Sequence, residues 1–306
     1  MRLKKLATAA ASIALLGSAA LADEERPVVG LVMKSLANEF FQNMMVGAEA
    51  HAEERGDYDL LAVGMQNETD FESQINAVNN FITQSVDAIV IAPADSRAMV
   101  RPIQRAIDAG IVVVNFDVAL DAEAKEQQGL ELAFVGPDNR QGAQLVGNAL
   151  AEALGEGANV VIIEGNPGAD NATQRRLGFE DSIAEFNLNL LDSRTAYWET
   201  EEANTVFANM LTANPNIQGV MAANDSMAIG VVQALAAAGR DDVLVVGFDN
   251  VPAASQLVAE GKLLATVDQF GTEMAANAID LAIEVVQGGP ELAGWVRTPI
   301  ELVTQE

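Results

Sequence analysis

The chain has 306 residues, of which 44 are Asp or Glu and 17 are Lys or Arg, and its formal net charge is −27. Such an acidic chain repels nucleic acid and anionic lipid surfaces, so we expect neither as a partner. The absence of cysteine excludes disulfides and thiolate chemistry, and a hydrophobic content of 50% is sufficient for the cores of two domains.

The first 22 residues have the pattern of an export signal. Basic residues near the N-terminus precede an apolar stretch from Leu6 to Ala19, and Ala20-Leu21-Ala22 fits the small-x-small cleavage pattern. The apolar stretch is shorter than the roughly 20 residues that cross a bilayer. We therefore expect cleavage after Ala22, with an uncleaved membrane anchor as the alternative.

Strand and helix signals alternate along the rest of the chain. Buried strands are expected near residues 27–33, 60–63, 87–91, 111–116, 132–136, 159–164, 189–195, 217–221, 243–248 and 263–267, with a last edge strand at 295–304. Helices are expected near 38–52, 70–84, 96–109, 139–154, 172–187, 200–213, 224–238, 252–260 and 272–287, and the acidic segment 118–130 as a surface excursion. This alternation predicts an α/β fold whose parallel sheets are covered on both faces.

Two parts of the chain repeat each other. The apolar runs 111–117 and 243–249 both end in Phe-Asp, and the upstream segments 92–96 and 222–226 both end in Asp-Ser. This repetition predicts two similarly wound lobes. In open α/β sheets, ligands bind outside the carboxyl ends of the strands. If these edges of the two lobes face each other, they form a cleft that is lined from both lobes.

Several motifs resemble one known family. The chain carries LVMKSLANEFF at 31–41, QRRLGF at 174–179, MAANDSMAIG at 221–230, VVGFD at 245–249 and ATVDQ at 265–269. Together, in this order, they resemble the ribose- and allose-binding group of periplasmic solute-binding proteins, which serve ABC importers. The resemblance covers essentially the whole chain after the export signal. It implies two Rossmann-like lobes that close around one monosaccharide, in a periplasmic protein that acts as a monomer.

The resemblance also implies how the chain divides. The N-terminal lobe is expected to contain residues 23–136 plus 270–297, and the C-terminal lobe residues 137–269 plus 298–306. Three hinge crossings are expected near Val135–Pro137, Asp249–Pro252 and Asp268–Gly271. The partners implied are a monosaccharide or polyol and the permease of an ABC importer, with a chemoreceptor as a further alternative.

Asp117 and Asp249 are the first candidates for the binding site because they end equivalent strands. Each carboxylate can accept two hydroxyl protons, and such charge-assisted bonds contribute roughly 1.5–3 kcal/mol each. The alternative is that each residue caps the next turn. The family motif favours Arg175 over its neighbour Arg176 as a donor to sugar oxygens through its planar guanidinium.

The remaining candidates are amides, a lysine and aromatic rings. Asn38, Asn224 and Gln269 can donate to and accept from hydroxyls, although both asparagines could also cap helices. Lys34 follows a buried strand and could reach a sugar oxygen or face solvent. Phe41 and Trp198 are expected to stack against the sugar. Phe40 is included in the site, although Phe40, Phe116 and Phe248 could instead pack beneath it.

One position departs from the family pattern. Val118 follows Asp117, where ribose-binding members carry arginine and allose-binding members carry glutamate. The site therefore loses one polar group. The bound molecule could lack a hydroxyl there, could present a C–H face, or could be a polyol or cyclitol.

Other protein classes with such lobes fit less well. The sequence has no Gly-x-Gly-x-x-Gly after a strand, no phosphate loop and no His/Cys cluster, so we expect no cofactor and no metal. Its single histidine, His51, lies in the first predicted helix and is assigned no role. Glycoside chemistry by Asp117 and Asp249 is the enzymatic alternative. A regulator of the lactose-repressor type would need a DNA-binding headpiece. We do not expect one, because the first predicted strand follows directly after the predicted export signal and the acidic charge is unfavourable for binding DNA.

Overall fold

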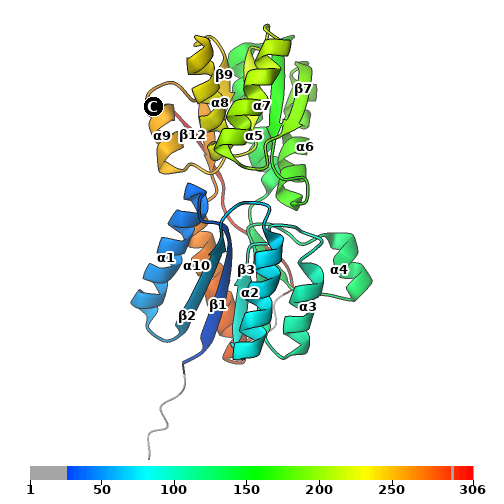
Figure 1. Ribbon diagram of the computed structural model, residues 1–306, viewed down its shortest axis with the longest axis vertical. Helices are drawn as coiled ribbons and strands as arrows, with labels where there is room; N and C mark the ends of the chain where they lie inside the picture. The colour runs from blue at the N-terminus through cyan, green and yellow to red at the C-terminus, as the bar shows by residue number, and fades with distance from the viewer. Residues whose placement is uncertain (1–25, 291–292, 306) are drawn as a thin grey trace, which may run out of the picture.

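The computed structural model describes residues 26–290 and 293–305. Within these ranges the chain forms two α/β lobes, one above the other (Figure 1). The predicted export signal and its cleavage after Ala22 lie outside the described residues. No helix of the described ranges combines the length and the hydropathy needed to cross a bilayer.

The first lobe contains a six-stranded sheet in the order β11-β5-β4-β3-β1-β2, and every neighbouring pair is parallel. Its strands are β1 (Val28–Ser35), β2 (Asp59–Met65), β3 (Ala88–Ile91), β4 (Val112–Phe116), β5 (Ala133–Gly136) and β11 (Gly294–Arg297). Its helices are α1 (Glu39–Arg55), α2 (Phe71–Gln84), α3 (Val100–Asp108), α4 (Ala122–Gln128) and α10 (Gly271–Val286). Helix α10 packs on α1, and α2 packs on α3.

The second lobe repeats this design in the order β12-β10-β9-β8-β6-β7. Its strands are β6 (Asn159–Glu164), β7 (Asn189–Thr195), β8 (Gly219–Ala222), β9 (Leu244–Val246), β10 (Ala265–Asp268) and β12 (Glu301–Thr304). Its helices are α5 (Asn139–Leu154), α6 (Asp170–Glu185), α7 (Thr200–Ala213), α8 (Asp225–Ala238) and α9 (Pro252–Ala259). Only β12 runs antiparallel to its neighbour, β10, among the strands described in this lobe.

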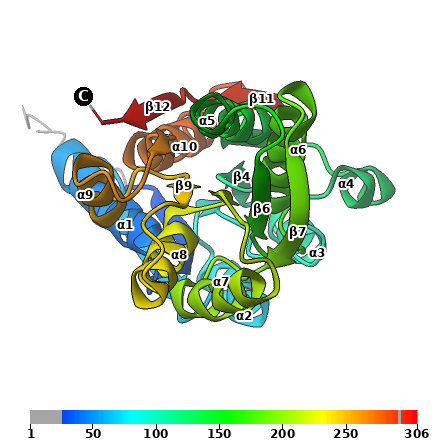
Figure 2. The same ribbon diagram turned by 90° about the horizontal axis from the view of Figure 1, so that it is seen from above.

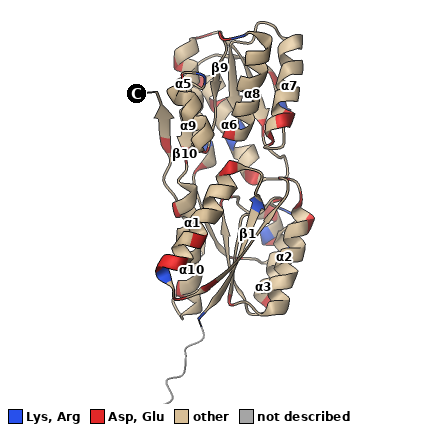
Figure 3. Ribbon diagram, turned by 60° about the vertical axis from the view of Figure 1, so that its left-hand side comes forward, with Lys and Arg blue, Asp and Glu red and all other residues tan. Residues whose placement is uncertain are grey.

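Strand burial explains why the sequence pattern was informative. The central strands β3 and β8 are buried along their whole length because helices cover both faces of each sheet. Continuous apolar runs are therefore required there. Figure 3 shows Asp and Glu residues on helices of both lobes, so the acidic residues are not confined to one lobe.

One local expectation was incomplete and another was wrong. The segment 118–130 lies largely at the surface, as expected, but it also contains a short helix, α4, whose N-terminus is capped by the Asp121 carboxylate. The tail 295–304 forms two strands in different sheets, since β11 pairs with β5 and β12 pairs with β10. Pro299 separates these strands, and it has no backbone N–H for a continuous ladder.

The chain passes from one sheet to the other between β5 and α5, between β10 and α10, and between β11 and β12. Figure 2 places α5, α10, β11 and β12 on the same side of the molecule. The crossing expected at Asp249–Pro252 was wrong, because α9 packs on β10 and β12 and stays within the second lobe. The Phe-Asp motif at 248–249 therefore lies at the edge of a sheet, and the chain does not cross to the other lobe at this point.

Candidate ligand-binding site

A cavity with an empty volume of about 230 Å³ lies between the facing edges of the two sheets. The structure brings every residue predicted for the site to this cavity and adds one more, Asn171. The lining residues are Lys34, Asn38, Phe40, Phe41, Asp117, Asn171, Arg175, Trp198, Asn224, Asp249 and Gln269.

The two aspartates occupy equivalent positions in the two lobes. Asp117 follows β4 and Asp249 lies just beyond β9, with left-handed φ angles of 62° and 117°. Their backbone N–H groups donate to Val135 O at 2.9 Å and Val267 O at 2.8 Å in the neighbouring strands. Non-glycine residues held in this region are typical of ligand sites, where the surrounding structure compensates for the strain. Neither carboxylate caps a helix in the described structure, contrary to the alternative interpretation.

Arg175 is the cationic centre of the second lobe. Its Nε donates to Asn139 Oδ1 at 2.9 Å, and its Nη1 donates to Ala223 O at 2.8 Å and to Asp249 Oδ1 at 3.3 Å. The guanidinium carbon lies 3.6 Å from the centroid of the Phe248 ring, so the two groups form a cation–π contact. Its neighbour Arg176 instead pairs with Glu164 and Glu180 near the surface and does not line the cavity.

Lys34 forms a buried ion pair that the sequence did not predict. Its Nζ lies 2.9 Å from Glu68 Oε2, and both side chains are almost fully buried. The ammonium also lies 5.1 Å from the centroid of Phe41 and 5.3 Å from that of Trp198, within the range of cation–π attraction. The same Glu68 carboxylate accepts from Asn38 Nδ2 at 2.8 Å. Glu68 therefore fixes two residues of the cavity without lining it.

The side chains of Asn38 and Asn224 both cap helices and line the cavity. Asn38 Oδ1 accepts from Phe40 N at 3.0 Å and caps α1, and Asn224 Oδ1 accepts from Met227 N at 2.9 Å and caps α8. Both predicted capping interactions are confirmed, and both residues also line the cavity. Gln269 Nε2 donates to Asp249 Oδ1 at 2.7 Å, whereas its Oε1 is buried and has no partner among the described residues.

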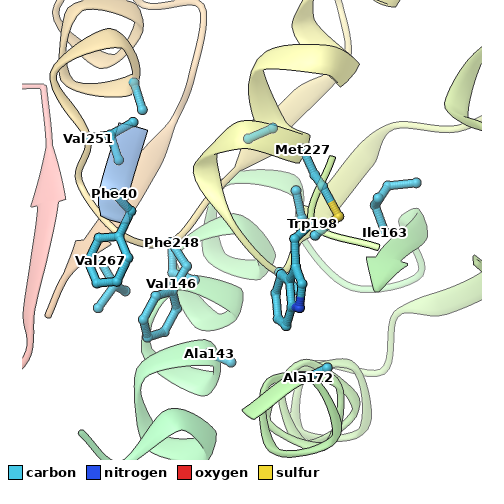
Figure 4. Packing of buried hydrophobic residues seen from close by; sticks show 14 of the residues in the cluster. Phe40, Ala143, Val146, Ile163, Ala172, Trp198, Met227, Phe248, Val251 and Val267 are labelled. Atoms are coloured by element: carbon cyan, nitrogen blue, oxygen red, sulfur yellow. The ribbon is translucent and has the colours of Figure 1, made fainter. Parts of the chain in front are cut away.

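The aromatic residues divide into rings at the cavity and rings beneath it. Trp198, Phe40 and Phe41 line the cavity, whereas Phe116 and Phe248 are fully buried and do not. Figure 4 shows Trp198 and Phe248 in one hydrophobic cluster with side chains of α5 and α6. Gly165 leaves room for the indole, because a Cβ there would lie 2.1 Å from Cζ2 of Trp198.

Burial dominates the ionisation of the site. It raises the pKa of Asp117 to about 6, and the nearby Lys34 and Arg175 charges oppose this increase. It also raises the pKa of Asp249, again against the attraction of Arg175. Burial lowers the pKa of Arg175, while the carboxylates of Asp249 and Asp117 oppose that change. Each carboxylate is therefore poorly solvated and would gain from hydroxyl donors.

The two lobes contact each other directly around the cavity. Glu68 N of the first lobe donates to Glu199 Oε1 of the second at 3.1 Å. At another point of the rim, Ser96 N donates to Gly168 O and Asp170 N donates to Ser96 Oγ, both at 2.9 Å. The structure thus represents a closed arrangement, held by hydrogen bonds that an open cleft would lack.

Positions that the sequence singled out for other reasons lie away from the cavity. Val118 is fully buried and does not line the cavity, so it offers no polar group to a ligand. His51 lies on α1 and bonds to Asp280 on α10 at 2.7 Å. Within the described part of the chain, no group of three or more His, Asp or Glu side chains is arranged to hold a metal ion.

Asn171 and Glu68 were not predicted, although each has a weak signal in the sequence. Asn171 lies four residues before Arg175, and residues at this spacing share one face of a helix. Glu68 stands in a polar loop after β2, where composition alone suggests a solvated carboxylate. Its burial depends on Lys34 and Asn38, which lie about 30 residues away in sequence.

Comparisons with known proteins agree with this geometry. The family described as "periplasmic binding protein domain" matches residues 29–290. The chain belongs to this family. Among its relatives in the family, the D-ribose/D-allose-binding protein of Pseudomonas aeruginosa is 44% identical over 302 residues, which cover 97% of this chain and 95% of the relative. The ribose import binding protein of Escherichia coli is 32% identical over 288 residues, which cover 94% of each chain.

Solved structures of periplasmic binding proteins have the same architecture. An ABC transporter solute-binding protein from Actinobacillus succinogenes with bound D-allose is 41% identical, has a TM-score of 0.87 and covers 92% of this chain and 98% of its own. One from Bacillus halodurans with bound myo-inositol is 30% identical, has a TM-score of 0.83 and covers 92% of this chain and 96% of its own. The predicted family and fold, with two lobes of mostly parallel sheets, are therefore confirmed.

Proposed function

We propose that this periplasmic binding protein captures a monosaccharide between its lobes and delivers it to an ABC importer. The observation that carries the proposal is the cavity itself. Carboxylates, amides and a guanidinium reach it from both lobes, together with three aromatic rings. A sugar offers hydroxyls that donate and accept, plus C–H faces that pack on rings, and this lining complements both.

The charges of the cavity favour a neutral ligand. Lys34 is neutralised by Glu68 and Arg175 by Asp249, so among the described residues that line the cavity Asp117 is the charged group without an ion-pair partner. A phosphate or carboxylate on the ligand would face the negative charge of Asp117, whereas hydroxyls can donate to it. The relatives whose names specify D-ribose and D-allose fit this expectation, and both are neutral sugars.

We propose capture without chemical change. Asp249 Oδ1 already accepts from Arg175 and Gln269, which suits a fixed hydrogen-bond acceptor better than a nucleophile. Family membership supports the same conclusion, since its relatives are described as binding proteins. Turnover of any bound sugar would contradict this part of the proposal.

The proposed mechanism is a population shift between open and closed lobes. One moving unit comprises residues 23–136 plus 270–297, and the other residues 137–269 plus 298–306. Sugar contacts from both lobes favour the closed form in proportion to its better affinity for that form. The importer permease then recognises the closed monomer in the periplasm, after cleavage of the export signal at Ala22.

A ligand panel tests the proposal. Pentoses, hexoses, deoxy sugars, polyols and inositols are added separately to the mature protein, and its melting temperature is measured. A ligand that binds only the folded state raises this temperature by mass action, so we expect a rise with at least one pentose or hexose. The proposal fails if no member of the panel changes the melting temperature or binds by calorimetry. A rise with inositols or polyols alone would assign a different ligand class to the same cavity.

A further inference from the structure

We propose that Asn171 determines sugar specificity by hydrogen bonding to one hydroxyl of the bound molecule. This inference rests on the proposed function and refines the chemistry of the same cavity. Asn171 lies in the first turn of α6, four residues before Arg175, and it lines the cavity beside it. Its side chain is 4% exposed.

The Asn171 amide oxygen has no partner among the described residues. Its Oδ1 is buried and accepts no hydrogen bond from any residue of the described ranges. It does not cap α6, whose N-cap residue Ala169 has no side chain suited to that role. The Asp170 N–H in the same turn is already bonded to Ser96. Leaving a buried amide oxygen unpaired is costly, so its persistence at a cavity indicates a partner supplied by a ligand.

Other unpaired atoms converge on the same cavity. The carboxylate oxygen Asp117 Oδ2, the amide oxygen Gln269 Oε1 and the indole nitrogen Trp198 Nε1 are also buried and unpartnered within the described chain. Together with Asn171 Oδ1 they present three acceptors and one donor. Hydroxyls can satisfy all four, because each hydroxyl donates one proton and accepts another. A ligand that satisfies these atoms needs several free hydroxyls, and Asn171 selects for one of them.

Calorimetric titration with D-ribose, D-allose and the tightest-binding sugar of the panel tests the inference. We expect Asn171→Leu to weaken binding of that sugar at least tenfold. Asn148→Leu is a matched control, because Asn148 also lies in a helix with a buried, unpaired Oδ1 but does not line the cavity. We expect the control to bind within twofold of the wild-type protein. Asn171→Ala provides a second variant in case leucine disturbs folding.

The affinities for deoxy sugars distinguish a hydrogen bond to the ligand from a purely structural role of Asn171. If Asn171 reads one hydroxyl, the loss caused by Asn171→Ala should disappear for the analogue that lacks this hydroxyl and persist for the other deoxy analogues. The melting temperature of the ligand-free variant should not fall, because the substitution removes no hydrogen bond to Oδ1 within residues 26–290 and 293–305.

The outcomes separate the two proposals. If the wild-type protein binds no sugar, the proposed function fails. If the wild-type protein binds a sugar and both Asn171 variants bind it within twofold, only the role of Asn171 is overturned. The role is also overturned if every deoxy analogue loses affinity equally, since that pattern indicates a general displacement of the site.

Discussion

A bulky side chain at Gly168 should hold the cleft open without altering any residue of the cavity. Gly168 lies in the loop between β6 and α6 of the second lobe, and a Cβ at this position would lie 2.5 Å from Asp95 Oδ2 of the first lobe. No native Cβ contact is that short. The tip of the Asp95 side chain can move away from one methyl group, whereas a leucine needs the lobes to separate at this point.

The size of the effect follows from the contacts that separation breaks. At this rim Ser96 N donates to Gly168 O, Asp170 N donates to Ser96 Oγ, and Asn166 Nδ2 donates to Ala94 O at 3.4 Å. At roughly 1 kcal/mol for each hydrogen bond, the closed form loses about 2–3 kcal/mol. Because the apparent affinity scales with the population of the competent form, the Kd should rise roughly 30- to 150-fold in Gly168→Leu.

Titration calorimetry of the tightest-binding sugar measures this change, and X-ray scattering at saturating sugar measures the closure. We expect a small effect for Gly168→Ala and a large effect for Gly168→Leu. The ligand-free melting temperature should stay close to that of the wild-type protein because the open form lacks these contacts. The reasoning is refuted if Gly168→Leu binds sugar as tightly as the wild-type protein and becomes equally compact.

Three further predictions concern the buried charges. Lys34→Met leaves the Glu68 carboxylate buried without its ion-pair partner, so the free energy of unfolding in urea should fall by roughly 3–5 kcal/mol, and adding Glu68→Gln should restore most of it. Arg175→Lys removes the planar donors and should weaken sugar binding at least tenfold by calorimetry, whereas the matched control Arg176→Lys should stay within twofold. Asp117→Asn should stabilise the sugar-free protein more at pH 8 than at pH 4, with an upper limit of about 3 kcal/mol in urea denaturation.

The sign of the Asp117 prediction follows from the raised pKa. The folded protein binds this proton more tightly than the unfolded chain, so the stabilisation by protonated Asp117 is fully present below about pH 4. It is lost as the pH rises through about 6, and asparagine avoids that loss. A stability difference that does not change with pH would contradict the assignment. The Lys34 prediction is contradicted if the double variant Lys34→Met/Glu68→Gln is as unstable as Lys34→Met alone. The Arg175 prediction is contradicted if Arg175→Lys and Arg176→Lys bind the sugar with equal affinity.

The fold was predictable because its strands are buried on both faces. A strand such as Ala88–Ile91 must be apolar throughout, and its signal is therefore local. The repeated Phe-Asp motif revealed the duplicated lobes for the same reason, since equivalent strands end at equivalent edges. The tail was harder, because β11 and β12 are short, partly exposed strands whose pairing depends on distant sheets.

The candidate site was predictable where a residue type is rarely needed for any other purpose. Paired aspartates at strand ends fall in this class, whereas Arg175 was distinguished from Arg176 only by the resemblance to the family motif. Glu68 could not be predicted, because a glutamate in a polar loop is ordinarily exposed and only the folded chain brings it to Lys34. Asn171 could not be separated from a helix-capping asparagine until the structure showed that its amide caps nothing.

The two equivalent aspartates have unequal surroundings, and this inequality suggests how the lobes share the work of binding. Asp249 is held by Arg175 and Gln269 of its own lobe, so its orientation is fixed before a ligand arrives. Asp117 keeps one buried oxygen that has no partner among the described residues, so closing the empty cleft desolvates it, and the Lys34 and Arg175 charges offset only part of this cost. A sugar hydroxyl that donates to Asp117 removes this penalty. We therefore expect Asp249 to provide a preformed part of the site and Asp117 to make closure depend on the ligand, because a ligand hydroxyl can replace the water that Asp117 loses.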